Sequence, residues 1–508
     1  MSTPKEYVRV RMQGRITTLS PLHVGSGSVR SFSARLAAMR RQLPPNHGLV
    51  LAAMDPQKDD DAEDSYAAVY CDAHGRPCIP ASTLRGALRA AAPAEARERL
   101  FGPEHIDEQT GGRSGCVRLS DARLERSSPI AAATAQQIPY FDADRSTGIQ
   151  HGIAIDPITG AVREHMLYRL EFVPAAAEFT FSALLLDASE QDLRHFAQAV
   201  RQLDQRSLGK GVAQGYGRIG VSDPCWEALD ATRLAEWAAS PGAPLENHYR
   251  RLPAPVAAAL PRSGRIAFQL IADGPLLIHQ PGLDRAQPRG DGDAETQDVM
   301  MCDRDSQNRP RLPGTTLKGW ARARARRILH TLYARIHAAR NSDIAHTSSA
   351  IDKAIALLFG SAGRRSIVYF SDAIAATSAT HAQTFNAIDR FTGGVMPDAL
   401  YRVDAVLADR FDASLGLDVD TLDDWQRGLL LWVLRDALEG DLVLGWGKGK
   451  GYGDLRLCIT ATGAAGIETW PDALQALQNV FGSGAPAAWA HALEKHVASM
   501  GKTTAKKG

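Results

Sequence analysis

The chain lacks the sequence features of membrane, secreted and zinc-ribbon proteins. Its net charge is only +1, and no apolar run approaches the roughly 18 residues that a membrane span needs. Its six cysteines are scattered and none forms a CxxC pair, which argues against a disulfide framework and against a zinc ribbon. The opening segment MSTPKEYVRV has no apolar signal-peptide core. We therefore expect a cytoplasmic protein with free thiols and no membrane partner.

The common nucleotide-binding motifs are also missing, although each half contains a glycine-rich segment. Residues 208–217 read LGKGVAQGYG, and residues 444–453 read LGWGKGKGYG. Neither fits GxxxxGK[ST], because no Ser or Thr follows a lysine there, and neither fits GxGxxG. These segments are therefore not expected to hold a nucleoside triphosphate or a dinucleotide. The near-neutral net charge argues against an overall basic coat, but it does not bear on a local basic groove.

The chain contains nearly the same sequence twice. Four motifs recur in the same order: a Pro-containing turn before a basic helix, an SDA segment, an ID-TG motif followed by LYR, and the glycine-rich segment. An LFG triplet precedes SDA in each half. The copies lie at 79–89 and 312–322, at 117–122 and 368–373, at 155–171 and 388–404, and at 208–217 and 444–453. This ordered recurrence indicates a duplicated domain, because its period is far too long for a solenoid repeat.

Each half predicts an α+β fold. Its β-rich and helical segments follow the order β-α-β-β-α-β, which is typical of a ferredoxin-like (RRM-like) core, and long polar stretches between them predict insertions. We place the first unit at 1–245, a linker rich in proline and alanine at 246–262, the second unit at 263–464, and a helical extension with a basic end at 465–508.

The helix after the Pro-containing turn carries the first candidates for RNA binding. A hydroxyl at a helix start accepts a hydrogen bond from a free backbone N–H, so the Ser and Thr residues there predict an N-terminal cap. Cations four residues apart share one helix face, and beside a helix N-terminus they suit a phosphodiester backbone. The alternative is a solvated helix face. The candidates are Ser82, Thr83, Arg85 and Arg89 in the first half and Thr315, Thr316, Lys318 and Arg322 in the second.

The glycine-rich segments carry further candidates for RNA binding. Glycine lets a backbone approach an anion closely, the lysines add positive charge, and a tyrosine can stack on a base. The alternative is a tight helix-to-strand turn. The candidates are Lys210 and Tyr216 in the first half and Lys448, Lys450 and Tyr452 in the second.

The PLHVG loop at 21–25 and the repeated motifs, taken in order, resemble the RAMP superfamily and more narrowly the backbone subunits of type III CRISPR effector complexes. The resemblance implies two tandem RAMP domains with a modified RNA-recognition fold, each with an acidic loop, a thumb β-hairpin and a C-terminal glycine-rich loop. It also implies the partners: a guide CRISPR RNA, a complementary target RNA whose duplex with the guide is kinked by the thumb, and other effector subunits.

The resemblance further implies a metal-dependent endoribonuclease that uses Mg²⁺ or Mn²⁺ and an aspartate in the loop before the basic helix. In the second half Asp298 precedes the apolar residues 299–301 and then Asp303 and Asp305, which fits the family spacing within a residue. A carboxylate at this place could hold the metal ion or align the 2′-hydroxyl for attack. The alternative is a solvated acidic loop.

In the first half this loop is longer, and the counterpart of the catalytic aspartate is less clearly defined. Asp64 is the nearest equivalent as catalytic residue and metal ligand, with Asp72 in the downstream position, and the aspartates at 59–61 stay open. His23 lies in the PLHVG loop, where the family often has a histidine near the guide RNA. We therefore include His23 as an RNA contact, with a packing role as the alternative.

Three functions remain open at this point. The first is a double backbone subunit that binds guide RNA and cuts target RNA at one or both units, and the second is the same scaffold without catalysis. The third is a CRISPR-RNA processing endonuclease of the same superfamily, which would use a histidine without metal. The duplicated motifs favour a filament subunit. We expect Asp156 and Asp389 of the ID-TG motifs to form structural turns, because such side chains bond their own backbone two residues on.

Overall fold

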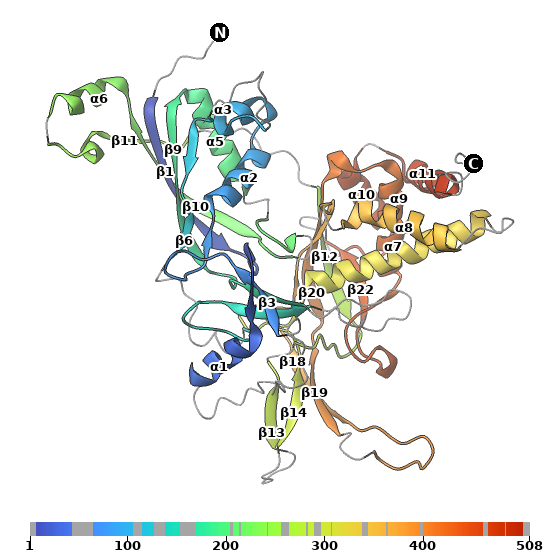
Figure 1. Cartoon of the computed structure of the whole chain (residues 1–508). Coiled ribbons are helices and arrows are strands. Elements are labelled where there is room, and N and C mark those ends of the chain that lie inside the picture. The colour runs from blue at the N-terminus through green and yellow to red at the C-terminus, as the bar shows by residue number, and fades with distance from the viewer. Residues whose placement is uncertain are drawn as a thin grey trace.

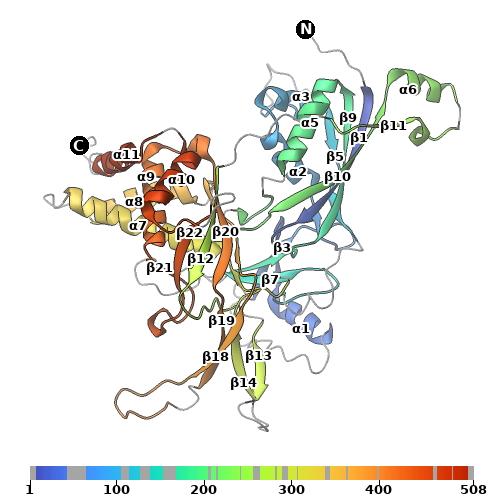
Figure 2. The ribbon, with the colours of Figure 1, turned by 180° about the vertical axis from the view of Figure 1, so that it is seen from behind.

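The chain folds into two similar units that lie side by side, the first coloured blue to green and the second yellow to red in Figure 1. Figure 2 shows the same arrangement from behind. The computed structural model describes residues 7–42, 64–104, 114–125, 138–152, 168–203, 207–212, 215–240, 242–255, 264–280, 283–288, 296–305, 307–337, 344–361, 364–396, 400–460, 466–482 and 484–500.

The first unit is built on an antiparallel sheet with the strand order β11-β10-β1-β9-β6-β4, in which β5 also pairs with β9. Alternate residues of its central strand, Val10, Met12 and Ile16, are fully buried under helices α2 and α5. This alternation is what a sheet with one covered face requires. The strands are β1 (Tyr7–Thr18), β4 (Cys78–Ile79), β5 (Val117–Leu119), β6 (Ala122–Leu124), β9 (Glu178–Ala188), β10 (Ile219–Leu229) and β11 (Arg250–Leu252).

The helices of the first unit are amphipathic where they cover the sheet. α5 begins at a capping box in which the Ser189 hydroxyl accepts from the N–H of Asp192, and it buries Leu193, Phe196 and Val200 on one side. The helices are α1 (Phe32–Gln42), α2 (Ala81–Ala91), α3 (Arg97–Phe101), α5 (Glu190–Gln202) and α6 (Ala231–Ala238), with short 3₁₀ turns η1 (Ala94–Ala96) and η4 (Leu245–His248).

The second unit repeats the other strands of this sheet in the order β15-β17-β20-β12-β22-β21, in which β16 also pairs with β20. Its edge strand differs, because β21 precedes its partner β22 in the chain whereas β11 follows β10. The strands are β12 (Gly264–Ala272), β15 (Arg311–Leu312), β16 (Val368–Phe370), β17 (Ala373–Ile374), β20 (Arg410–Leu417), β21 (Leu442–Val443) and β22 (Asp454–Ile459). The helices and 3₁₀ turns are α7 (Gly314–His337), α8 (Ile344–Phe359), α9 (Asp424–Leu438), α10 (Trp470–Phe481), α11 (Pro486–Met500), η5 (Val419–Thr421) and η6 (Lys448–Lys450).

Each unit also carries a smaller four-stranded sheet made from the predicted insertions. The orders are β2-β3-β8-β7 and β13-β14-β19-β18, and the central pair is parallel in both. In Figure 1 the second of these sheets projects from the body of the molecule. The strands are β2 (Gly25–Ser31), β3 (Ser65–Val69), β7 (Gly148–Gly152) and β8 (Tyr168–Phe172), and β13 (Arg285–Pro288), β14 (Thr296–Met301), β18 (Ala379–Phe385) and β19 (Tyr401–Leu407). The matching topology confirms the predicted tandem α+β units.

The segments around the two units pack against them. Strand β11, within the segment we assigned to the linker, pairs with β10 and so extends the first sheet beyond residue 245. α10 and α11 pack on the second unit, where Leu477, Phe481, Trp489 and Leu493 are fully or almost fully buried in one core with Leu429. The predicted extension is therefore a covering layer of that core, and the lysine-rich end at 501–508 lies outside the described residues.

The helix caps differ from the prediction. α2 begins directly after Pro80 and no side chain of its own caps it, because Ser82 and Thr83 already lie within the first turn. Instead the carboxylate of Asp121 accepts a hydrogen bond from the Ala81 N–H at 2.8 Å. In the second unit Asp372 likewise accepts from the Gly314 N–H at 2.8 Å. The predicted hydroxyl caps are thus wrong, and the aspartate of each SDA motif caps the helix from the connection between two neighbouring strands.

A buried charge cluster lies where the two units meet. Arg311 donates to both oxygens of Asp303 at 3.0 Å and lies 3.4 Å from Asp372. The Arg311 and Asp303 side chains are 7% and 0% exposed. Arg311 also donates to Gln150 of the first unit at 3.3 Å, and Gln150 donates to Gln280. Burial raises the pKa of Asp303 and that of Asp372, while Arg311 opposes both shifts.

Replacing Arg311 with methionine should strongly destabilise the chain. The substitution leaves two buried carboxylates without their cation, which typically costs about 3–5 kcal/mol in the free energy of unfolding. Arg309→Ala is the matched control, because Arg309 forms a more exposed pair with Asp305 at 2.6 Å whose loss should cost at most about 1 kcal/mol. Urea denaturation followed by tryptophan fluorescence measures both. Equal, small losses in the two variants would show that the cluster does not stabilise the fold.

Candidate RNA-binding interface

Asp298 lies in the second strand of the small sheet of the second unit. It pairs with Ala286 across β13–β14, and its side chain is exposed while the next residue, Val299, is fully buried. Neighbouring side chains of a strand point to opposite faces, so Asp298 faces solvent because Val299 faces the core. A carboxylate at this place is accessible to a ligand as large as RNA.

The parallel strand pairs give the register between the two units. Ala67 lies opposite Leu170 in β3–β8. Met300 lies opposite Val403 in β14–β19. Leu170 and Val403 hold the same place in the repeated LYRLE and LYRVD segments. Ala67 and Met300 are therefore structural counterparts.

This register corrects the predicted counterpart of Asp298. Ser65 lies two residues before Ala67, and Asp298 lies two residues before Met300. Ser65 is therefore the counterpart of Asp298, and Asp64 precedes that position by one residue. The downstream turn gives the same alignment, because Asp72 and Asp305 each bind an arginine four residues later. Asp72 is thus in the predicted downstream position, whereas the position of Asp298 carries a serine in the first unit.

Asp64 instead holds the start of helix α1. Its carboxylate accepts hydrogen bonds from the Ser33 N–H at 2.7 Å, from the Ser31 hydroxyl at 2.7 Å and from the Ser33 hydroxyl at 2.9 Å. Partial burial alone would raise the pKa of Asp64, but these hydrogen bonds outweigh it and lower the pKa below its ordinary value. The contacts give Asp64 the role of a helix cap.

The described residues do not themselves form a divalent-metal site. Among them the structure has no group of three His, Cys, Asp or Glu side chains that could hold a metal ion, around Asp298 or elsewhere. The aspartates at 59–61 and the acidic residues at 289–295 lie outside the described residues. The Mg²⁺ or Mn²⁺ site therefore stays a prediction.

The basic pair of the first helix is bound to backbone. The guanidinium of Arg85 donates to the carbonyl of Phe101, and that of Arg89 donates to the carbonyl of Gly102. Both carbonyls belong to the LFG triplet that ends α3, which explains why this triplet follows the helix in the sequence. The contacts favour a structural role for these two arginines, while Ser82 beside them is exposed.

The corresponding pair of the second unit lies in a more buried place. Burial, and secondarily the charge of Arg322, lower the pKa of Lys318 to about 8. Arg322 itself is exposed, and Thr315 and Thr316 are half-buried in the first turn of α7. Of this set, Arg322 presents the most accessible cation to a ligand.

The glycine-rich segments form tight turns against the connecting segment that follows β1 or β12. Gly209 and Gly445 have φ values of 78° and 85°, a region that L side chains rarely adopt. A Cβ at Gly209 would lie 2.1 Å from the His23 carbonyl, and one at Gly445 would lie 2.5 Å from the Leu277 carbonyl. Only glycine allows this approach, so the turn interpretation is confirmed.

Three of the predicted RNA contacts are buried. His23 is 2% exposed, and its Nδ1 lies 2.6 Å from the Glu171 carbonyl; burial lowers its pKa. Tyr216 is 7% exposed and packs edge-on against Phe172. Tyr452 is 2% exposed, and its hydroxyl donates to Gln383 at 2.5 Å. These side chains shape the turns and are not free to stack on a base. Lys210, which follows the first of these turns, has an exposed side chain.

The predicted lysines of the second glycine-rich segment lie on a surface whose aromatic residues the sequence analysis missed. Lys448 and Lys450 are exposed, and the Lys450 ammonium donates to the Tyr401 hydroxyl at 2.7 Å. It also lies 4.3 Å from the centre of the Phe385 ring and 5.2 Å from that of Trp446. Phe385 and Tyr401 face each other across β18–β19, a contact that only the strand pairing reveals. Such a surface suits the phosphates and bases of single-stranded RNA.

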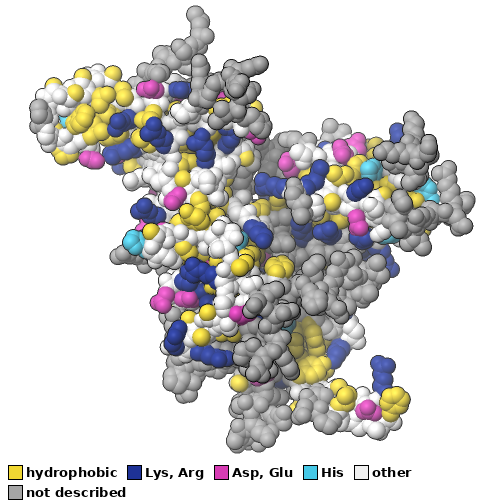
Figure 3. All heavy atoms as spheres, viewed as in Figure 1, with side chains coloured by type: hydrophobic (Ala, Val, Ile, Leu, Met, Phe, Trp, Pro, Cys, Tyr) yellow, Lys and Arg dark blue, Asp and Glu magenta, His cyan; other side chains and the backbone are white. Residues whose placement is uncertain are grey.

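The second ID-TG motif forms the predicted turn beyond β18. Asp389 accepts hydrogen bonds from the N–H groups of Phe391 and Thr392 at 2.9 and 2.7 Å. Phe391 is 99% exposed, and it shares this end of the hairpin with the exposed side chains of Ile388 and Val395. Figure 3 shows apolar side chains at the tip that extends from the body. The first copy, which includes Asp156, lies outside the described residues.

The two copies of one α+β unit, each with a second small sheet and a glycine turn, define a duplicated RNA-recognition-type protein. The chain belongs to the RAMP superfamily, whose family model matches residues 15–220 and 281–456, one match in each unit. This superfamily consists of CRISPR-associated RNA-binding proteins. A comparison with curated proteins gave no match. None of the helices in the described part of the chain is both long and apolar enough to cross a membrane.

His151, near the contact between the units, is held neutral. Its ring stacks on Tyr140 with centroids 5.1 Å apart and contacts Phe32 edge-on at 5.4 Å. Among the described residues its buried Nε2 has no hydrogen-bond partner. Burial, followed by the charges of Arg169 and His279, lowers the pKa of His151 to about 4. Protonation of this ring therefore opposes folding.

The stability of the chain should fall on mild acidification. Between pH 6.5 and about 4 the unfolded chain binds a proton at His151 that the folded chain does not, so the free energy of unfolding decreases as the pH drops, by up to about 3 kcal/mol from this group. His151→Phe should flatten that slope, whereas substitution of the exposed His74 by Gln should not. Urea titrations at several pH values measure it. An unchanged slope in His151→Phe would contradict the assignment.

Proposed function

We propose that this protein is a guide-RNA-binding double backbone subunit of a type III CRISPR ribonucleoprotein, which also takes part in cleaving complementary target RNA. The observation that carries the proposal is the repetition of one complete unit, in the same strand register, within a chain of the RAMP superfamily. Two equal units in one chain would contact two successive stretches of one RNA. A processing enzyme that makes one cut has no need of such a repeat.

RNA binding in the second unit would centre on the exposed glycine-rich segment and on the aromatic rings beside it. Lys448 and Lys450 supply charge for phosphates, and the rings of Phe385, Tyr401 and Trp446 supply surfaces for bases. These contacts read backbone and ring faces rather than base edges, which suits a subunit that must accept any guide sequence.

The exposed tip of the β18–β19 hairpin would act as the thumb. Its apolar side chains, including Phe391 and Ile388, are exposed and are not covered by other described residues. An apolar wedge of this kind can separate neighbouring base pairs and kink a duplex. The Asp389 turn supports the tip by fixing its backbone.

Cleavage would depend on Asp298 in the second unit. Its exposed carboxylate is placed on a rigid strand, where it could take the proton of a 2′-hydroxyl as that oxygen attacks the adjacent phosphorus and the 5′-oxygen leaves. The first unit has Ser65 at this place, and Asp64 is engaged with α1. We therefore propose one Asp298-dependent cut and a first unit that only binds RNA.

Asp298→Ala should abolish one cleavage product while guide binding persists. Loss of a general base lowers a rate by about 10²–10⁴-fold, so the cut should disappear from a denaturing gel of labelled target RNA. The chain is assembled for this with guide RNA and partner subunits. Asp64→Asn, which keeps an acceptor for the Ser33 N–H, and Ser65→Ala are controls that should leave every product in place. Loss of guide binding in Asp298→Ala would assign the residue a structural role instead.

Chelation should distinguish the three remaining functions. If the cut uses Mg²⁺ or Mn²⁺, as the family resemblance implies, EDTA will stop it and either ion will restore it. A cut that persists in EDTA would contradict metal-dependent cleavage and favour a metal-independent processing endonuclease. Tight guide binding without any cut in the wild type would make the chain a non-catalytic scaffold.

A further inference from the structure

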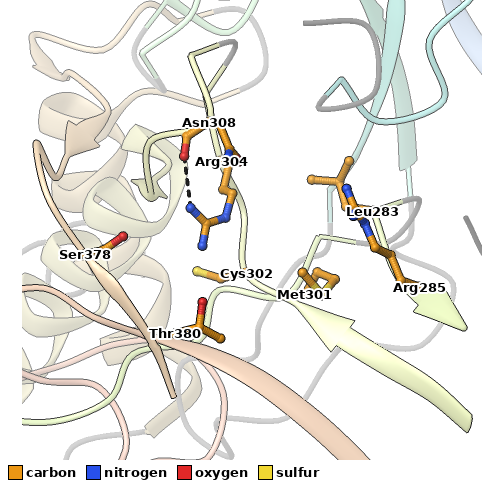
Figure 4. Close-up of a pocket in the computed structure, with 8 residues that line it drawn as sticks. All are labelled: Leu283, Arg285, Met301, Cys302, Arg304, Asn308, Ser378 and Thr380. Carbon is orange, nitrogen blue, oxygen red and sulfur yellow. Dashed lines mark hydrogen bonds between the residues drawn. The ribbon is translucent and has the colours of Figure 1, made fainter. Parts of the chain in front are cut away.

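A cavity of about 310 Å³ opens in the second unit beside its small sheet. Its walls come from β13, from the end of β14 with the loop that follows, and from the segment leading into β18. Figure 4 shows Arg304 projecting between Ser378 and Cys302 above Thr380, while Leu283 and Arg285 form the opposite wall. The cavity has the size of a small-molecule site, for which about 300–1,000 Å³ is usual.

The cavity is positively charged. Arg285 and Arg304 line it, no Asp or Glu does, and neither arginine takes part in an ion pair among the residues that the structure describes. Arg304 donates one hydrogen bond, to the Asn308 carbonyl at 2.9 Å, which fixes its guanidinium in place. Burial raises the pKa of Cys302 to about 12, so this thiol adds no negative charge.

The same place in the first unit is filled. There the guanidinium of Arg145 lies 3.4 Å from the Cys71 sulfur and 2.9 Å from Glu171. The hydroxyl of Thr147 also donates to Glu171, at 2.7 Å. The fold itself therefore does not require a cavity at this place.

The residues of the second unit differ at those positions. The bridges Cys71–Pro77 and Arg304–Pro310 make Arg304 the counterpart of Cys71. The pairings β7–β8 and β18–β19 make Thr380 the counterpart of Thr147. Two residues earlier, Ser378 is therefore the counterpart of Arg145. The second unit has the small Ser378 where the first has Arg145, which leaves space, and it has Arg304 where the first has Cys71, which places a guanidinium beside that space. The first difference provides the cavity and the second provides positive charge.

We propose that this cavity binds the phosphate of a nucleotide, either as a free mononucleotide or as one residue of bound RNA. Two guanidinium groups and the hydroxyls of Ser378 and Thr380 supply donors for phosphate oxygens, and guanidinium forks match phosphate geometry. The apolar side chains of Leu283 and Met301 complete the wall against which a sugar or base would lie.

This site is separate from the proposed cleavage site and goes beyond it. Arg285 pairs with Val299 in β13–β14, whereas Asp298 pairs with Ala286, so Arg285 and Asp298 belong to opposite faces of the small sheet. Nucleotide binding in the cavity therefore does not depend on Asp298, and Asp298→Ala should leave it unchanged.

Calorimetric titration of the full chain with adenosine 5′-monophosphate, adenosine and inorganic phosphate tests the proposal, together with a short oligouridylate as the RNA arm. Arg304→Ala should weaken binding of the monophosphate at least about tenfold, because a charged hydrogen bond is lost. Thr380→Phe keeps both arginines but fills the space, and it should weaken binding similarly. Arg309→Ala, in the same loop but paired with Asp305, is the matched control and should bind normally. Thermal midpoints report that each variant is folded.

The outcomes separate the two sources of phosphate. Binding of the monophosphate that both cavity variants lose assigns a free nucleotide. No binding of the monophosphate, with oligouridylate affinity reduced about tenfold in both variants, assigns an RNA residue. Adenosine binding as tightly as its monophosphate, or unchanged affinities in both cavity variants, would each overturn the proposal.

Discussion

One guanidinium held between a fully buried and a mostly buried carboxylate connects three separate parts of this molecule. Arg311 lies between Asp303, which follows the strand that bears Asp298, and Asp372, which caps helix α7. It also reaches Gln150 of the first unit. Since each buried charge needs the others, the strand, the helix start and the neighbouring unit hold fixed positions together. Any RNA bound along both units would therefore meet two faces with a defined relative orientation.

Duplication has preserved the backbone of the units and changed their chemistry. The glycine turns, the aspartate caps and the order of both sheets recur, apart from the edge strands β11 and β21, because these features depend on strand register and on positions where only glycine fits. The side chains differ where ligands or the other unit would be met. Ser65 corresponds to Asp298, Cys71 corresponds to Arg304, and Arg311 has a counterpart in Cys78. The two units are thus one scaffold with two different surfaces.

The sequence predicted the tandem α+β fold correctly because its repeated motifs and the periodicity of its strands and helices are visible without knowledge of tertiary contacts. It predicted the capping and stacking residues poorly because those depend on contacts between distant segments. Asp121 lies 40 residues from the N–H that it caps, so no local pattern reveals it. The rings of Tyr216 and Tyr452 could stack on a base if they were exposed, yet the strands packed over them bury both. Whether Asp64 or Ser65 matches Asp298 depends on the strand register, because a shift of one residue moves a side chain to the other face of the sheet.

The covalent link between two unlike units fixes their ratio in any assembly. Wherever this chain assembles, the unit with Asp298 and the unit with Ser65 are delivered in equal number and in a set order, whatever the concentrations of other components. Their contact through Gln150 and Arg311 is intramolecular, so its strength does not depend on protein concentration. In any particle that contains this chain, each unit with Asp298 is therefore followed or preceded by a unit with Ser65, and neither can be exchanged for the other during assembly.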